Sequence, residues 1–156
     1  INGRSVLLEL KSIKFFDSFP VDIMYSLFKN IAPAILRHWS GLFFKDNQLS
    51  NSEYTIPNSV WTNIRKIVLY SILLLQGILP KRHLNGWAKF VHAVKLCLKR
   101  KIDTAELLEI NQLFCEFVTH YEKEYLQNNP LRLPAALISY HYLLHIASSI
   151  CNTGPA

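Results

Sequence analysis

The sequence has few of the residues from which common catalytic loops and covalent frameworks are built. Only five glycines and three cysteines occur in 156 residues. A Gly-rich phosphate loop, a Gly-x-Ser-x-Gly elbow and a Cys-x-x-Cys pair are all missing, which argues against the enzyme classes that depend on these motifs. The cysteines Cys97, Cys115 and Cys151 are odd in number and widely spaced, so we expect no disulfide framework and a reducing, intracellular compartment.

Long hydrophobic runs are missing as well. The longest run, at residues 67–75, is interrupted by Ser71. It is well short of the roughly 18 residues that a membrane-spanning helix needs, so we interpret it as a buried helix. The chain shows no secretory leader and begins with Ile1 instead of Met, and we therefore expect it to be a piece of a longer protein.

The residues that are present suit one domain with a substantial core, since half of them are apolar and 12% are aromatic. Apolar residues keep helical spacing over residues 22–39, 58–76, 85–101, 103–127 and 134–151. Residues 5–14 (SVLLELKSIK) form a short apolar segment that is compatible with a strand. The sequence therefore predicts a mainly α, helical bundle-like fold with a short N-terminal strand.

Several residues mark the expected helix boundaries. Pro33 should kink or divide the first helix. Asp103, followed three residues later by Glu106, forms the clearest helix start, a capping box. Gly77 should close the helix before it, and Gly154 is suited to the C-terminal cap of the last helix.

Charge is divided sharply between two consecutive segments, although the whole chain carries +6. Residues 80–101 contain seven basic residues and no acid: Lys81, Arg82, Lys89, Lys95, Lys99, Arg100 and Lys101. Residues 103–124 contain six acids against one lysine: Asp103, Glu106, Glu109, Glu116, Glu122 and Glu124. Two solvated faces that attract each other across a helical hairpin would explain this division. A basic face for nucleic-acid phosphates would explain it equally well.

Two histidines have a spacing that zinc sites use. His141 and His145 are four residues apart and therefore share one face of a helix. A zinc hydrolase would also need Glu directly after the first histidine, where this chain has Tyr142. We therefore expect both histidines to be core or interhelical hydrogen-bonding residues, and Cys151 to be a small buried residue.

The segment FPVDIMY at residues 19–25 places Asp22 where an extended stretch becomes a helix. A carboxylate in this position can cap the helix, which stabilises it by about 1 kcal/mol. It can also direct both of its oxygens at one metal ion. The local residues alone favour the cap.

The order of several segments resembles the transposases of CACTA-type (En/Spm-like) DNA transposons, especially the fungal forms. The blocks are GRSVLLELKSI (3–13), FPVDIMYSLFKNIAP (19–33), LPKR (79–82), KIDTAEL (101–107), FVTHYEKEY (117–125) and HYLLHIASSICNTGP (141–155). In that family a segment like FPxDxMH precedes a helical region, a helix containing YE, and an H-x-x-x-H helix that ends in GP. These six ordered blocks are spread over nearly the whole chain, from residue 3 to residue 155.

This resemblance implies an RNase H-like catalytic domain in which three carboxylates bind two Mg²⁺ or Mn²⁺ ions and transfer phosphodiester bonds at transposon ends. Asp22 matches the family's second catalytic aspartate. Residues 1–20 would be the end of the RNase H-like strand region, and residues 21–156 the helical region inserted before the third acid. The resemblance further implies a nuclear protein with transposon and target DNA as partners, and a possible homo-oligomer in the longer protein.

This chain departs from the family pattern in ways that bear on activity. Tyr25 stands where the family has a histidine beside the metal site, and residues 63–70 join two blocks that the family separates by a longer stretch. The first catalytic aspartate and the final acid do not lie within the chain, so this fragment alone should not cut DNA. The alternative is a domesticated or decayed transposase remnant that serves as a non-catalytic DNA- or protein-binding helical module.

Overall fold

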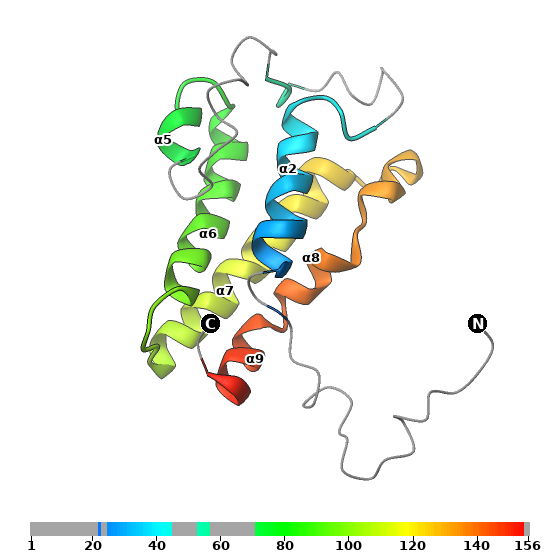
Figure 1. Cartoon of the computed structure of the whole chain (residues 1–156). Helices are drawn as coiled ribbons and strands as arrows, with labels where there is room; N and C mark the ends of the chain where they lie inside the picture. The colour runs from blue at the N-terminus through cyan, green and yellow to red at the C-terminus, as the bar shows by residue number, and fades with distance from the viewer. Residues whose placement is uncertain (1–21, 23–24, 45–52, 57–70, 155–156) are drawn as a thin grey trace, which may run out of the picture.

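The computed structural model describes residues 22, 25–44, 53–56 and 71–154 (Figure 1). Every regular element in this part of the chain is a helix, which confirms the predicted mainly α class. The elements in chain order are η2 (Tyr25–Ile31), α2 (Ala32–Trp39), α5 (Ser71–Leu75), α6 (Lys81–Cys97), α7 (Thr104–Tyr121), η4 (Glu122–Leu126), η5 (Pro130–Ala135), α8 (Ile138–Leu143) and α9 (Ile146–Thr153). The strand predicted at residues 5–14, and the strand region at residues 1–20, lie outside the described residues.

The two longest of these helices, α6 and α7, pack against each other as a hairpin. The predicted capping box at the start of α7 is confirmed. The Asp103 carboxylate accepts a hydrogen bond from the Glu106 backbone N–H at 2.7 Å, and the Glu106 carboxylate accepts one from the Asp103 N–H at 3.1 Å. These bonds satisfy two backbone donors that a helix start otherwise leaves unpaired, so the turn after α6 leads directly into α7.

Aromatic side chains fill the interface between α6 and α7. Trp87 stacks on Phe90 with ring centroids 4.7 Å apart, and Phe90 lies 4.9 Å from Phe117 and 6.2 Å from Phe114. All four side chains are buried. Burying each such side chain contributes about 1.5–3 kcal/mol, which makes this interface the centre of the core.

The first helical region crosses this hairpin. Helix α2 carries Trp39, which meets Trp87 of α6 edge-on with ring centroids 5.3 Å apart. The region changes from π to α geometry at Ala32, directly before Pro33. Because proline has no N–H to give to the preceding turn, the hydrogen-bond ladder must change there. The predicted division of this helix is confirmed.

The predicted boundaries of α6 are wrong by about one turn at each end. Helix α6 begins at Lys81, not at Asn85, and ends at Cys97, not at Lys101. Pro80 immediately precedes it in an extended conformation, a position where its missing N–H costs nothing. Asn85, where the helix was predicted to begin, lies instead inside it.

The single final helix predicted for residues 134–151 is also wrong, because the chain forms η5, α8 and α9 in succession. Ala136 and Leu137 leave helical geometry, with ψ of 66° and 136°, and this separates η5 from α8. Leu144 and His145 form a turn between α8 and α9. The predicted cap at Gly154 is confirmed, since its φ of 90° suits glycine and ends α9.

Most of the helix predicted at residues 58–76 lies outside the described residues, and its last part forms α5. Gly77 closes it with φ of 83°, as predicted. None of the helices that the structure describes is both long enough and apolar enough to cross a membrane.

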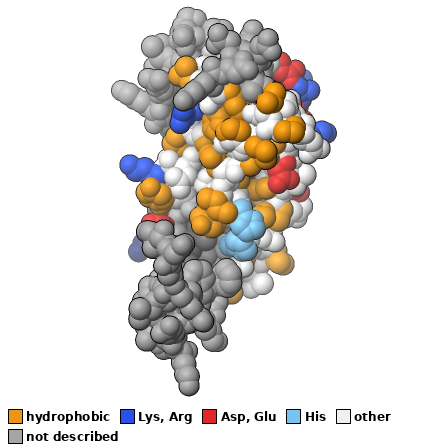
Figure 2. Space-filling model, turned by 90° about the vertical axis from the view of Figure 1, so that its right-hand side faces the viewer, with side chains coloured by type: hydrophobic (Ala, Val, Ile, Leu, Met, Phe, Trp, Pro, Cys, Tyr) orange, Lys and Arg blue, Asp and Glu red, His pale blue; other side chains and the backbone are white. Residues whose placement is uncertain are grey.

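One face of the molecule carries a concentration of exposed apolar side chains (Figure 2). They come from η5, α8 and the link between them: Leu131, Leu133, Leu137, Ile138 and Tyr142. Leu131, Leu133 and Ile138 each keep more than 60% of their surface accessible. A groove of about 240 Å³ runs beside them between α7 and α8. The rest of the described structure leaves these side chains uncovered.

Replacing Gly86 by alanine should destabilise the fold. A Cβ there would lie 2.1 Å from Cδ2 and 2.2 Å from Nε2 of His120, so α6 and α7 could not keep their present separation. Gly-to-Ala inside an exposed helix normally stabilises by about 1 kcal/mol, whereas overpacking costs about 1–3 kcal/mol. We expect a lower free energy of unfolding, measured by urea denaturation.

The matched control is the same Gly86→Ala change in a His120→Ala background. Removing the imidazole makes room for the new methyl group, so there the change should be neutral or stabilising. An equal loss of stability in both backgrounds would refute close packing as the reason for this glycine.

Candidate functional site

A ladder of ion pairs joins α6 to α7 and its extension η4. Lys89 Nζ lies 2.7 Å from a Glu116 carboxylate oxygen, and His92 Nε2 lies 3.6 Å from Glu109. A third pair joins Lys99 to Glu106, and Arg82 Nε lies 3.2 Å from Glu124 at the far end. Residue numbers fall along one helix while they rise along the other, so the helices run antiparallel. The prediction of two charged faces that attract each other across a hairpin is confirmed.

These ion pairs fix the positions of the charged side chains but contribute little to the stability of the fold. The side chains are mostly exposed, and such pairs contribute about 0–1 kcal/mol each. The hydrogen bond to Glu106 raises the pKa of Lys99, and the same bond lowers the pKa of Glu106. Lys89 likewise lowers the pKa of Glu116. Lys99, Glu106 and Glu116 therefore stay charged at neutral pH.

The ladder leaves part of the basic segment uncompensated. Lys81, Lys95, Arg100 and Lys101 are exposed, and in the described part of the chain none of them lies within ion-pair distance of a carboxylate. Lys95 is near the end of α6, and Arg100 and Lys101 follow in the turn to α7. Positive charge therefore gathers at the α6–α7 turn.

Asp22 is exposed and has the hydrogen bonds of a helix cap. Its Oδ1 accepts from the Tyr25 backbone N–H at 2.8 Å, and its carbonyl accepts from the Ser26 N–H at 2.9 Å. The prediction of a cap is thus confirmed. Among the described residues, the one group of three potential metal ligands does not include Asp22, and its metal-binding role stays a prediction. Tyr25 itself is 57% exposed.

His141 and His145 face each other on the surface. Their Nε2 atoms are 3.2 Å apart and their rings meet edge-on, as the shared helix face predicted. Of the two predicted settings, the core position is wrong, because both side chains are exposed. The hydrogen-bonding setting is confirmed, since His141 belongs to α8 and His145 directly precedes α9. Cys151 is also exposed, which corrects the prediction that it is buried.

A buried polar network ties α2 to α7. The Tyr121 hydroxyl donates to the Ala135 carbonyl at 2.8 Å, so His38 Nε2, 2.9 Å away, must donate to that hydroxyl. His38 is therefore neutral with its proton on Nε2. Burial, with the nearby positive charges of Arg132 and Arg37, lowers the pKa of His38 from 6.5 to about 3.

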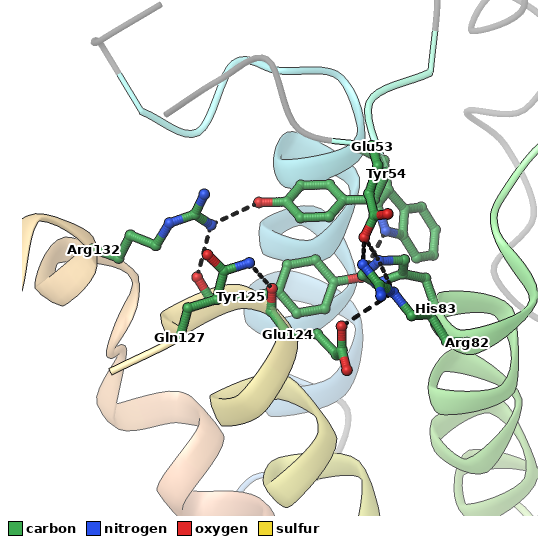
Figure 3. Close-up of polar contacts among 9 residues, drawn as sticks. Glu53, Tyr54, Arg82, His83, Glu124, Tyr125, Gln127 and Arg132 are labelled. Carbon is green, nitrogen blue, oxygen red and sulfur yellow. Dashed lines mark hydrogen bonds and ion pairs between the residues drawn. The ribbon is translucent and has the colours of Figure 1, made fainter. Parts of the chain in front are cut away.

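The same network continues toward the loop at residues 53–56 (Figure 3). The Trp39 indole N–H donates to the Tyr125 hydroxyl at 2.8 Å. Arg132 Nη1 donates both to the Tyr54 hydroxyl and to the Tyr125 carbonyl, each at 3.0 Å. A buried guanidinium needs such partners, because an uncompensated charge in the interior is costly. Arg132 therefore fastens η5 and the loop to the end of η4.

Next to this network, charged and metal-ligating side chains converge from three segments (Figure 3). Glu53 comes from the loop, His83 and Arg82 from the first turn of α6, and Glu124 from η4. Arg82 pairs with both carboxylates. His83 Nε2 lies 3.3 Å from Arg82 Nε and 3.5 Å from Glu53. The ligand atoms of the two glutamates and the histidine lie within 4.8 Å of one another.

His83 is the buried member of this cluster. Because the Arg82 N–H can only donate, the Nε2 atom of His83 accepts and its lone pair faces the cluster. Burial, followed by the positive charge of Arg82, lowers the pKa of His83 from 6.5 to about 4. Burial likewise lowers the pKa of His120, which packs beside it, to about 4. The cluster thus presents a neutral imidazole to two carboxylates.

Sequence reasoning placed the basic residues and the histidine pair but missed this cluster. Its members are separated in the chain by the loop, by α6 and by α7, so no local spacing brings them together. The signal that could have found part of it is the charge division, since Arg82 lies near the outer end of the basic segment and Glu124 at the outer end of the acidic one. Glu53 lies in a polar loop, and no sequence pattern indicated a role for it.

The low pKa of His38 predicts loss of stability in acid. In the unfolded chain the imidazole takes up its proton near pH 6.5, but in the folded protein only near pH 3. The unfolded state therefore binds more protons between these values, and stability falls as pH falls through that window. In His38→Gln, which can still donate to Tyr121, the free energy of unfolding should depend less on pH. His92→Gln, at an exposed position, is the control. Identical pH dependence in His38→Gln and the parent would contradict the assignment.

The chain matches no protein-family model, no curated protein and no solved structure. Function must therefore be inferred from the charged ladder, from Asp22 and from the cluster around His83.

Proposed function

We propose that this chain is the helical region of a CACTA-type DNA transposase, and that it binds DNA by its phosphates without cutting it. The six ordered sequence blocks support the family relationship. The observation that carries DNA binding is the uncompensated positive charge of Lys95, Arg100 and Lys101 at the α6–α7 turn.

Phosphate binding requires cations that are exposed and free of competing carboxylates. Lys89, Lys99 and Arg82 do not meet this requirement, because α7, η4 and the loop at residues 53–56 supply their partners. The three cations at the turn do. Lys81 also meets it, but it stands alone at the other end of α6 and is not part of the proposed surface. Contacts of this kind give affinity and orientation on DNA but no sequence selectivity. We expect the same salt-sensitive affinity for duplexes of unrelated sequence.

Catalysis requires the longer protein. One carboxylate cannot hold the two Mg²⁺ or Mn²⁺ ions of an RNase H-like site, and Asp22 is the one family aspartate that this chain contains. The other two acids would come from outside residues 1–156, and a strand of the kind predicted for residues 5–14 would place Asp22 beside them. In this proposal the longer protein is nuclear, acts on transposon ends and target DNA, and is a candidate homo-oligomer.

A decayed or domesticated relative is the second candidate, and Tyr25 is the observation that favours it. A phenol replaces the histidine that the family places beside the metal, and it cannot act as a neutral proton acceptor near pH 7. Its side chain is more than half exposed, and its backbone N–H serves the helix cap. Such a protein would keep DNA binding and lose cleavage.

The charge-reduced variant Lys95→Gln/Arg100→Gln/Lys101→Gln tests the DNA surface. If each cation contacts one phosphate, the slope of log affinity against log salt should flatten by about 2.7, since each contact contributes about 0.9. The loss should be equal for duplexes of unrelated sequence. Fluorescence anisotropy with a labelled duplex, at several salt concentrations, measures both.

The matched control removes the same charge elsewhere, as Lys29→Gln/Arg37→Gln/Lys123→Gln, on η2, α2 and η4. This control should keep most of the salt slope. Equal slopes for the two triple variants would show that only net charge matters, and would remove the α6–α7 turn as the binding surface.

Two substitutions of Asp22 separate its role as a helix cap from the role of its negative charge. Asparagine caps a helix as well as aspartate, whereas alanine loses about 1 kcal/mol. Asp22→Asn should therefore leave the stability of this chain unchanged while it abolishes strand cleavage by the longer protein. Asp22→Ala should lower both stability and cleavage. Cleavage that survives Asp22→Asn would reduce Asp22 to a helix cap.

A further inference from the structure

The cluster of Glu53, His83 and Glu124 has the chemistry of a metal site and lies apart from the proposed DNA surface. Its three ligand atoms come from a loop, from α6 and from η4, and lie within 4.8 Å of one another. Ligands about 2.0–2.2 Å from a zinc ion lie roughly 3–4 Å apart. Glu53 already lies 3.5 Å from His83 Nε2, so the wider separation involves Glu124, and a small movement of that side chain toward the other two would close the difference.

We propose that Glu53, His83 and Glu124 bind one divalent transition-metal ion of the zinc class, in competition with the guanidinium of Arg82. One imidazole nitrogen and two carboxylates form a ligand set that suits zinc and its neighbours. Magnesium and calcium prefer oxygen ligands alone. A solvent molecule would complete four-coordination, as it does where three protein ligands hold zinc.

The imidazole of His83 is oriented for this role. Its ring is 1% exposed, and the Tyr54 and Tyr125 rings meet it edge-on with centroids 5.0 and 5.4 Å away. These contacts leave Nε2 directed at the two carboxylates, with its lone pair outward. The Nδ1 atom has no hydrogen-bond partner among the described residues, so the ring is fixed by packing and by the contacts of Nε2.

Arg82 now supplies the positive charge that this cluster needs. It pairs with Glu53 and Glu124, and without it two carboxylates would face each other beside a neutral histidine. Its side chain is 54% exposed, so it can turn out into solvent when a metal ion takes its place. Removal of Arg82 should therefore strengthen metal binding, a result that a purely structural ion-pair network does not predict.

Binding would also have a mechanical consequence. The three ligands belong to separate segments, so one ion would join the loop at residues 53–56 to the start of α6 and to η4. A ligand that binds only the folded state raises its stability in proportion to the logarithm of its concentration. Zinc should therefore raise the melting temperature, and this rise should disappear in variants that lack the ligand side chains.

Zinc titration by isothermal calorimetry tests the proposal, with melting temperature as a second readout. The experiment uses the chain with His141→Ala and His145→Ala, because the exposed histidine pair, with Nε2 atoms 3.2 Å apart, could itself hold zinc. In this background we expect one zinc ion per chain and no comparable binding of magnesium. Arg82→Gln should tighten zinc binding by about tenfold or more, and Glu124→Gln should weaken it by at least as much.

Glu53→Gln is the second ligand variant, and because the Glu53 side chain is about half exposed it should not disturb folding. Far-ultraviolet circular dichroism confirms that each variant remains helical. Zinc binding that appears in Arg82→Gln and vanishes in Arg82→Gln/Glu124→Gln supports the ligand set, even if the background protein binds weakly. Absence of binding in Arg82→Gln, or equal binding with and without Glu124, overturns the proposal.

Discussion

Helices α6 and α7 run antiparallel and pack through their aromatic faces. This packing fixes the positions of most other segments in the described part of the chain. It buries Trp87, Phe90, Phe114 and Phe117 in a continuous core. It also sets the register in which acids meet bases, so that the basic segment is neutralised along the hairpin and keeps uncompensated charge at Lys81 and near the turn. Close approach at Gly86 shows how tightly this register is held. A slip by one helical turn would break every ion pair at once.

Buried polar groups attach the remaining segments to this hairpin. Tyr121 and Tyr125 lie one turn apart near the junction of α7 and η4, and their hydroxyls receive hydrogen bonds from His38 and Trp39 of α2. A buried hydroxyl without a partner would cost about 1–3 kcal/mol, so these bonds select one docking position for α2. Apolar packing alone would tolerate several positions. The hydrogen bonds thus supply specificity, and the aromatic rings supply most of the stabilisation.

The sequence predicted those features that depend on neighbours along the chain. The capping box of Asp103 and Glu106, the glycine turns and the division at Pro33 are local, and all were correctly predicted. The start of α6 was missed because the helix was expected to begin at Asn85, whereas Pro80, five residues earlier, determined the boundary. The breaks between η5, α8 and α9 depend on packing against α7, which no local pattern records. The cluster around His83 was unpredictable for the same reason, since it exists only after the hairpin and the loop have come together.

The metal cluster and the cations of the α6–α7 turn lie at opposite ends of α6, and this separation makes these two regions electrostatically independent. Arg82 stands in the first turn of the helix and Lys95 in the last, which at 1.5 Å per residue places them roughly 20 Å apart along the axis. That distance is about twice the Debye length of about 8 Å at physiological salt. A metal ion that displaces Arg82 would add charge at one end while the potential at the turn stays nearly constant. Any influence of zinc on DNA binding would therefore have to travel through the rigid body of the helix, as a change in the position of α6 against α7.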